Sequence, residues 1–259
     1  MLNDSVGTLS RTPDSDLGAV HVYGADAVRF LQGQLSNDIA LLSPGQSMLA
    51  GLHNVQGRVI ALLRLVALAP DDVLAVLPRE LTAPVAARLA KYVLRAKVKV
   101  SDVSADAAFG AAIASVNSSA AERIAAGMPQ VYAATSEQFV AQMLNLDVVG
   151  AISFTKGCYT GQEVIARAHY RGRVKRRMQR FRTPAAVALS AGGSGTLRDG
   201  RSFKVVEAVT LDDGRSEFLA VAPLAHGDED GSAAEPATPP AADAAIDAEQ
   251  LTLLYELPA

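Results

Sequence analysis

The sequence has a single cysteine, Cys158, among its 259 residues, and it has no tryptophan. One thiol cannot form an internal disulfide. It also supplies only one of the four protein ligands that structural zinc or an iron–sulfur cluster usually needs. A disulfide-stapled secreted domain is therefore excluded, and any metal or cluster would have to be shared with a second molecule. We expect no permanent metal within one chain and a reducing, cytoplasmic location.

Long apolar runs are also missing. The beginning, MLNDSVGTLSRTPDSD, is polar and acidic, so it lacks the basic stretch and apolar core of a signal peptide. The most apolar segment, 59–69, is interrupted by Arg64. It is shorter than the run of about 20 apolar residues that crosses a bilayer. We therefore expect no association with membranes.

The signatures of common nucleotide-binding and hydrolase sites are absent. There is no Walker A loop, no G-x-G-x-x-G after an expected strand and no G-x-S-x-G. The histidines are scattered without metal-ligand spacing, so structural or surface roles are expected for them. They are His21, His53, His169 and His226.

The composition is that of a globular protein, with 49% apolar and 20% charged residues, and the length allows one large or two modest domains. Alternating apolar residues predict strands, and apolar residues at helical spacing predict helices beginning near Asp26 and Thr82. Leu81, Val85, Leu89 and Tyr92 mark the expected buried face of the second helix. The expected strands are 20–23, 48–54, 58–68, 73–77 and 97–103. This order indicates an α+β unit with a mainly antiparallel sheet.

The second half is less regular. Residues 101–126 are rich in Ala and Ser and predict a loop or a poorly formed helix, whereas Thr135 and Gln138 form a candidate capping box for a helix through Leu146. A short strand is expected at 151–154. Glycine-rich turns within 181–222 predict a small β-barrel or sandwich, to which a last strand at 251–257 would return. The Pro/Ala-rich segment 226–248 is expected to be a mobile linker.

The net charge of −3 hides an uneven distribution, because eight Lys and Arg residues and no acidic residue lie within 167–182. Such a run in an acidic protein suits an anionic partner, and 171–182 is a candidate RNA-binding stretch. A solvated strand face or a set of internal ion pairs explains the run equally well.

The segment KGCYTGQE at 156–163 concentrates reactive chemistry. Gly157 and Gly161 bracket Cys158, so the backbone can turn sharply and approach a ligand closely. Lys156 and a helix beginning near Gly161 would favour the thiolate, the form that attacks electrophiles and binds soft metals. Glu163 opposes this effect. Outside such a context, a lone cysteine is more often a small buried apolar residue.

KGCYTGQE followed by ARAHYRG resembles the signature of the YgfZ-type folate-binding proteins, relatives of the glycine-cleavage T-protein (aminomethyltransferase). Other segments similar to the family occur along nearly the whole chain, in the same order as in the family. They are GADAVRFLQGQLSND at 24–38, QGRVIALLRL at 56–65, AAGMP at 125–129, FVAQMLNL at 139–146 and LLYELP at 253–258.

The resemblance implies an α+β, multi-lobed T-protein-like ring over 1–172 and a C-terminal β-barrel domain over 173–259. It implies a reduced folate such as tetrahydrofolate as ligand, and a role in iron–sulfur cluster assembly or maintenance and thereby in tRNA modification. The partners would be iron–sulfur enzymes or assembly proteins. Cys158 would be the functional thiol, and the implied folate-binding residues are Lys156, Gly157, Tyr159, Gly161, Gln162, Glu163, Arg167, Arg171 and Arg64. For Arg64, a snorkelling side chain at a strand edge is the competing interpretation.

Two departures from the family pattern matter. The acidic residues that activate folate in the T-protein enzyme align with Ala61 and Leu62, which cannot hold a proton, so we do not expect a classical aminomethyltransferase. The stretch around 105–125 is shorter than in the family, which shortens one lobe beside the implied folate cavity. A folate-dependent one-carbon transferase and an RNA-binding module therefore stay open as alternatives.

Overall fold

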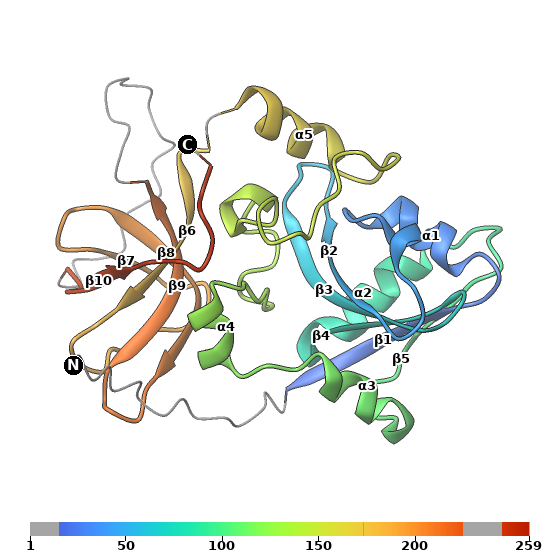
Figure 1. Ribbon diagram of the computed structural model, residues 1–259, viewed down its shortest axis with the longest axis horizontal. Coiled ribbons are helices and arrows are strands. Elements are labelled where there is room, and N and C mark those ends of the chain that lie inside the picture. Colours follow the sequence, from blue (N-terminus) through green and yellow to red (C-terminus); the bar gives the residue numbers. More distant parts are fainter. Residues whose placement is uncertain (1–15, 173, 225–244, 259) are drawn as a thin grey trace, which may run out of the picture. The chain divides into compact units, whose positions relative to one another are not determined.

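The computed structural model describes residues 16–172, 174–224 and 245–258 (Figure 1). These residues form two compact units. The first comprises 16–118 and 130–172, and the second comprises 119–129, 174–224 and 245–258. The second unit therefore takes one short segment from the middle of the chain.

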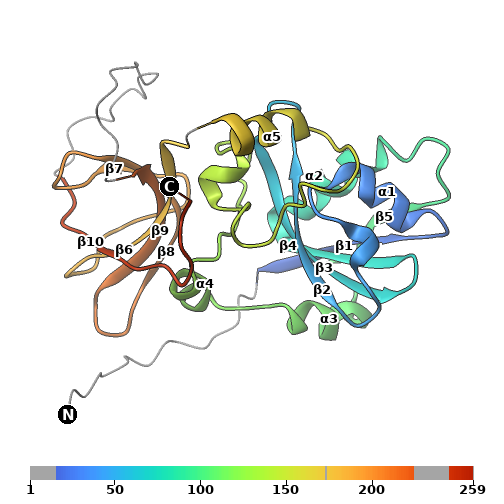
Figure 2. The ribbon, with the colours of Figure 1, turned by 45° about the horizontal axis from the view of Figure 1, so that its top comes forward.

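The first unit contains a five-stranded antiparallel sheet in the order β2-β3-β4-β1-β5 (Figure 2). Each strand overlaps a segment in which a strand was predicted. The strands are β1 (Leu17–Tyr23), β2 (Ser47–His53), β3 (Val59–Ala69), β4 (Asp72–Pro78) and β5 (Lys99–Asp102). The central strand β3 is buried along most of its length, which explains why its sequence is almost uniformly apolar.

Helices cover both faces of this sheet. α1 (Ala27–Gln34) and α2 (Arg79–Ala90) follow strands directly, and α2 buries Leu81, Val85 and Leu89 as predicted. The prediction for Tyr92 was wrong, because the helix ends before it and its side chain is 47% exposed. α3 (Gly110–Ser115) packs on the face carrying Leu17 and Ala19, whereas α2 covers the alternate residues of β1.

Three predictions for the middle of the chain were wrong. The segment 101–126 contains a well-formed helix, α4 (Ala120–Ala126), closed by a capping box between Ser119 and Glu122. The expected helix after Thr135 is a series of turns with one 3-10 helix, η3 (Ala141–Leu144), and the Thr135 hydroxyl caps a turn by accepting from the Tyr132 amide. The expected strand at 151–154 is irregular: the Ser153 amide and the Ala151 carbonyl both bond to Ser36, whereas the Ala151 amide donates to the Leu146 carbonyl.

The second unit contains a five-stranded antiparallel sheet in the order β10-β6-β9-β8-β7. Its strands are β6 (Arg176–Arg182), β7 (Ser194–Thr196), β8 (Ser202–Thr210), β9 (Ser216–Pro223) and β10 (Glu249–Leu251). The edge strands β7 and β10 form no ladder with each other; an isolated bridge between Leu197 and Ile246 lies beside them. The expected barrel is therefore an open sheet in the described residues. The prediction of a last strand at 251–257 was wrong, because β10 ends at Leu251. Most of the expected linker 226–248 lies outside the described residues.

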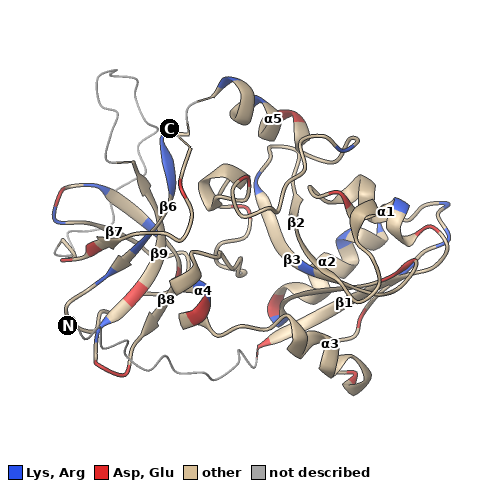
Figure 3. Cartoon of the chain, in the orientation of Figure 1, with Lys and Arg blue, Asp and Glu red and all other residues tan. Residues whose placement is uncertain are grey.

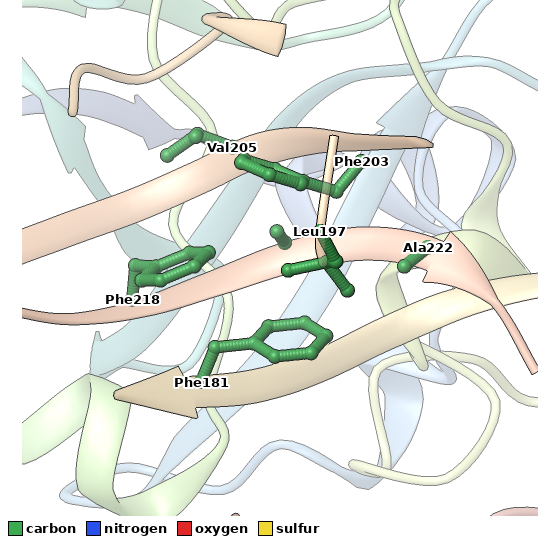
Figure 4. Packing of buried hydrophobic residues seen from close by; sticks show 7 residues of the cluster. Phe181, Leu197, Phe203, Val205, Phe218 and Ala222 are labelled. Carbon is green, nitrogen blue, oxygen red and sulfur yellow. The ribbon is translucent and has the colours of Figure 1, made fainter. Parts of the chain in front are cut away.

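An aromatic core holds this sheet together. Phe181, Phe203 and Phe218 are fully buried with Leu197 and Val205 (Figure 4), and the rings of Phe181 and Phe218 stack with centroids 5.3 Å apart. α4 packs against β8 and β9, where the buried Arg123 pairs with the buried Glu207.

No helix of the described residues is both long and apolar enough to pass through a membrane.

Candidate functional site around Cys158

The Cys158 loop is held against the turn between β2 and β3. Gly161 has a φ of +83° and immediately precedes α5 (Gln162–Arg171), confirming the predicted start of this helix. A Cβ atom at Gly161 would lie 2.5 Å from the Asn54 carbonyl oxygen, so only glycine fits this approach. Two segments about a hundred residues apart in the sequence therefore meet backbone to backbone.

The β2–β3 turn is rigidly built. The Asn54 side-chain oxygen accepts from the amides of Gln56 and Arg58, both at 3.0 Å, and the Asn54 carbonyl accepts from the Gly57 amide at 3.0 Å. Gly57 has a φ of +71°, and a Cβ there would meet the Val164 side chain at 3.1 Å. This turn forms a fixed support for the beginning of α5.

Lys156 anchors the loop from one side of the thiol. Its ammonium is buried and donates to the backbone carbonyls of Gln32 at 2.6 Å, Leu35 at 2.6 Å and Asn37 at 2.9 Å. These carbonyls belong to the last turn of α1 and the residues after it, which lack helical partners. Burial lowers the pKa of Lys156 to about 8, opposed by the charge of Asp38, so the group stays mainly protonated at neutral pH. All three N–H donors are used, which makes Lys156 a structural tie.

Tyr159 anchors the loop from the other side. Its ring is 7% exposed and lies 5.1 Å from the Lys156 ammonium, and burial raises the pKa of its phenol to about 12. The His53 ring lies 6.1 Å away. His53 is fully buried and neither of its ring nitrogens makes a hydrogen bond of normal geometry. Burial lowers its pKa to about 4, opposed by the Gly51 backbone, so the imidazole is neutral. Sequence analysis did not predict that this histidine lies beside the motif, because the two are about a hundred residues apart.

Cys158 itself is an exposed free thiol. Gly157 beside it is also exposed, and a Cβ there would meet no atom within 4 Å. The burial expected of an average lone cysteine is therefore not found. Two inward side chains, from Lys156 and Tyr159, fix the backbone on either side, and the thiol between them remains accessible to a second molecule.

The rest of the motif lies on α5. Glu163 and Arg167 form an exposed ion pair of 3.1 Å one helical turn apart, and Arg171 is exposed at the last turn. Such a pair contributes little to stability. The inward residue is Ile165, whose carbonyl accepts from the buried Gln142 amide at 2.7 Å. The outer face of α5 is therefore available for contacts.

Arg64 lies further along β3, the strand that follows the β2–β3 turn. It is buried in the middle of β3, where Leu49 and Val76 are its ladder partners, and its guanidinium donates to the Gln130 side-chain oxygen at 2.5 Å. The strand-edge interpretation was wrong, because β3 has neighbours on both sides. Ala61 and Leu62 on the same strand are fully buried.

The basic run divides into two parts (Figure 3). On β6, Arg180 and Arg182 pair with the buried carboxylate of Glu217 at 2.7 and 2.5 Å, and Arg176 donates to Ser202. Burial lowers the pKa of Arg176. Internal pairing therefore explains much of the β6 part. Arg173 lies outside the described residues, and the exposed positive charges of the run include Arg171 and Lys175.

An aromatic cluster adjoins the exposed part. Phe154 stacks on His169 with centroids 3.8 Å apart and an angle of 15°, and Tyr170 meets both rings edge-on at 6.1 and 4.8 Å. Sequence reasoning missed this cluster because Phe154 comes from the irregular segment that was expected to be a strand.

No group of three or more His, Cys, Asp or Glu residues in the described part of the chain is placed to hold a metal ion.

Sequence comparison identifies related bacterial proteins. No family model matches the sequence. An uncharacterized protein of Haemophilus influenzae is 30% identical over 229 residues, covering 74% of this chain and 82% of the relative. The tRNA-modifying protein YgfZ of Escherichia coli O157:H7 is 28% identical over 265 residues, covering 77% and 81%. The same protein of Enterobacter sp. is 44% identical over 96 residues, covering 36% and 29%.

A solved structure supports the fold. The glycine cleavage system aminomethyltransferase T from Bartonella henselae superposes with a TM-score of 0.62 and 18% identity, covering 82% of this chain and 77% of that chain. At this identity the likeness concerns the fold alone, and it agrees with the mixed helices and antiparallel sheets described above.

Proposed function

Because the chain belongs to the YgfZ-type, T-protein-like family, we propose that it is an accessory protein of tRNA modification that presents Cys158 to iron–sulfur enzymes or their assembly proteins. Two of the three relatives reported above are named as tRNA-modifying proteins. An exposed cysteine can act on a partner as a soft ligand for a cluster or by thiol–disulfide exchange.

The observation that carries the proposal is the construction of the loop. The chain fixes Lys156 by three carbonyls, buries Tyr159 and brings Gly161 against the Asn54 carbonyl, yet leaves the intervening thiol exposed. A cysteine that served only as a filler of the core would be buried. Because a single cysteine cannot complete a cluster site, the thiol acts together with groups of another molecule.

A reduced folate is the ligand we propose for the same unit. A folate carries a glutamate tail, and an exposed guanidinium such as that of Arg167 suits a carboxylate. The motif residues Gly157, Gln162 and Glu163 would line the approach, and Arg64 would contribute from β3. Lys156 and Tyr159 would support this site from behind, since their polar groups face inward.

A one-carbon transferase is the second candidate and has less support. Such an enzyme needs an acid or base near the folate, and the aligned positions hold Ala61 and Leu62, both buried. Failure to form any one-carbon product from a donor and tetrahydrofolate would remove this candidate.

The thiol can be tested in a bacterial strain that lacks its own copy of the protein. Cys158→Ser and Cys158→Ala are expected to fold normally and to abolish rescue, measured as the level of tRNA modifications made by iron–sulfur enzymes. Ser115→Ala, at an exposed serine of α3, is the matched control and should rescue fully. Full rescue by Cys158→Ala would contradict the proposed role of the thiol.

The folate part is tested separately by calorimetric titration with tetrahydrofolate at low and physiological salt. Saturable binding that weakens with salt is expected for an anionic ligand held by arginine. A protein that rescues cells but binds no folate would retain the thiol role and lose the folate.

A further inference from the structure

The last turn of α5 combines exposed aromatic rings with exposed positive charge. Tyr170 is 68% exposed, and His169 and Arg171 are exposed beside it. Phe154 stacks against His169 from a separate segment, which fixes the orientation of the imidazole. The chain has no acidic residue between Glu163 and Asp199, so the sequence around this turn carries positive charge only.

We propose that this surface, formed by Phe154, His169, Tyr170 and Arg171, binds an unpaired nucleotide stretch of RNA. Flat bases stack on exposed aromatic rings, and a guanidinium beside them pairs with the neighbouring phosphate. This site goes beyond the proposed function, because it requires neither the thiol nor folate.

Two features of the structure bear on RNA binding: the partners of the basic residues on β6 and the aromatic rings on α5. The basic run on β6, which suggested a nucleic-acid stripe, is largely occupied by Glu217 and Ser202. Aromatic rings adjoin the exposed charge on α5, where Phe154 joins His169 and Tyr170. The exposed charge and the exposed rings therefore coincide at one end of one helix.

We assign Arg171 to a phosphate of the RNA and not to the glutamate tail of folate. Arg167 has an acidic partner one turn away in Glu163, whereas Arg171 stands next to the aromatic cluster. A pterin would also stack on an aromatic ring, so folate is the competing occupant that the experiment must distinguish.

The test is fluorescence anisotropy of the full chain with a short, end-labelled, single-stranded RNA that has no self-complementarity. Saturable binding that weakens with salt is expected. Tyr170→Ala should weaken binding roughly 5- to 150-fold if one base stacks on this ring. Arg171→Ala should weaken it and reduce the slope of log affinity against log salt by about 0.7, the contribution of one phosphate.

Matched controls lie on the same unit. Tyr92→Ala removes an exposed tyrosine and Arg95→Ala an exposed arginine away from α5, and both should bind RNA as wild type does. Cys158→Ala should also bind normally, which separates this proposal from the proposed function. Excess tetrahydrofolate should not displace the RNA.

Three results would overturn the proposal. They are absence of saturable RNA binding, equal losses in the α5 variants and the Tyr92 and Arg95 controls, or displacement of the RNA by tetrahydrofolate. The last result would assign the surface to folate.

Discussion

Gly161→Ala changes the one position where the thiol loop and the β2–β3 turn meet. The substitution places an alanine at a φ of +83°, which costs about 1–2 kcal/mol because the Cβ crowds the carbonyl oxygen that follows it. The new Cβ would also stand 2.5 Å from the Asn54 carbonyl oxygen, a backbone atom that cannot rotate away. Forcing the segments apart adds about 1–3 kcal/mol, as overpacking typically does. We expect the free energy of unfolding to fall by about 2–5 kcal/mol.

Gly157→Ala is the matched control within the same loop. It lies on the other side of Cys158, and its Cβ would meet no atom within 4 Å. This change should leave stability unchanged or raise it by up to about 1 kcal/mol, because alanine restricts the unfolded chain.

Urea unfolding followed by far-UV circular dichroism measures the stability difference between the two variants. The rate at which Cys158 reacts with a thiol reagent under native conditions reports the loop itself, and it should change more in Gly161→Ala than in Gly157→Ala. Equal stabilities within about 0.5 kcal/mol, together with equal labelling rates, would refute the close approach described here.

Three further changes give distinct outcomes. Because the pKa of His53 is lowered to about 4 from 6.5, the unfolded chain binds more protons between these values. The contribution of neutral, buried His53 to stability is full above pH 6.5. It is lost as the pH falls, and the free energy of unfolding is lower by roughly 2 kcal/mol at about pH 5. Urea melts of His53→Leu should lack this component, and an unchanged pH profile would contradict it. Glu217→Gln should lower the free energy of unfolding by about 3 kcal/mol, because Arg180 and Arg182 lose their buried carboxylate; wild-type melting would show that the pairs are dispensable. Gly33→Ala should stabilise the protein by about 1 kcal/mol, since the site is exposed and open; a lower melting temperature would oppose this.

The strands of the first unit could be predicted because each depends on the pattern of apolar residues within its own segment. Val20 and Val22 alternate with partly exposed neighbours, and β3 is apolar because both of its faces are covered. The beginning of α5 at Gly161 was predicted for a similar reason, since a glycine followed by helical spacing marks a helix start. These features depend on residues that are neighbours in the sequence.

Long-range contacts explain what could not be predicted. Thr135 and Gln138 have the spacing of a capping box, but the Thr135 hydroxyl bonds within a turn. The segment that follows pairs with β3 through Val59. Arg64 was interpreted from its own strand, while its observed partner Gln130 is distant in sequence. The stacking of Phe154 on His169 likewise required a fold to bring the two segments together.

Residues 119–129 belong to the second unit, although they are synthesised between two parts of the first unit. They are therefore made long before the strands against which they pack. Arg123 leaves the ribosome well before Glu207, because the two residues are 84 positions apart. During that interval the Glu207 carboxylate is not yet available to Arg123, and α4 has neither β8 nor β9 to pack against. The first unit has by then received all of its residues, whereas α4 still lacks the strands of its own unit. A nascent or truncated chain that stops near 172 would therefore expose the inner face of α4, including Ala121 and Ile124, to chaperones and proteases.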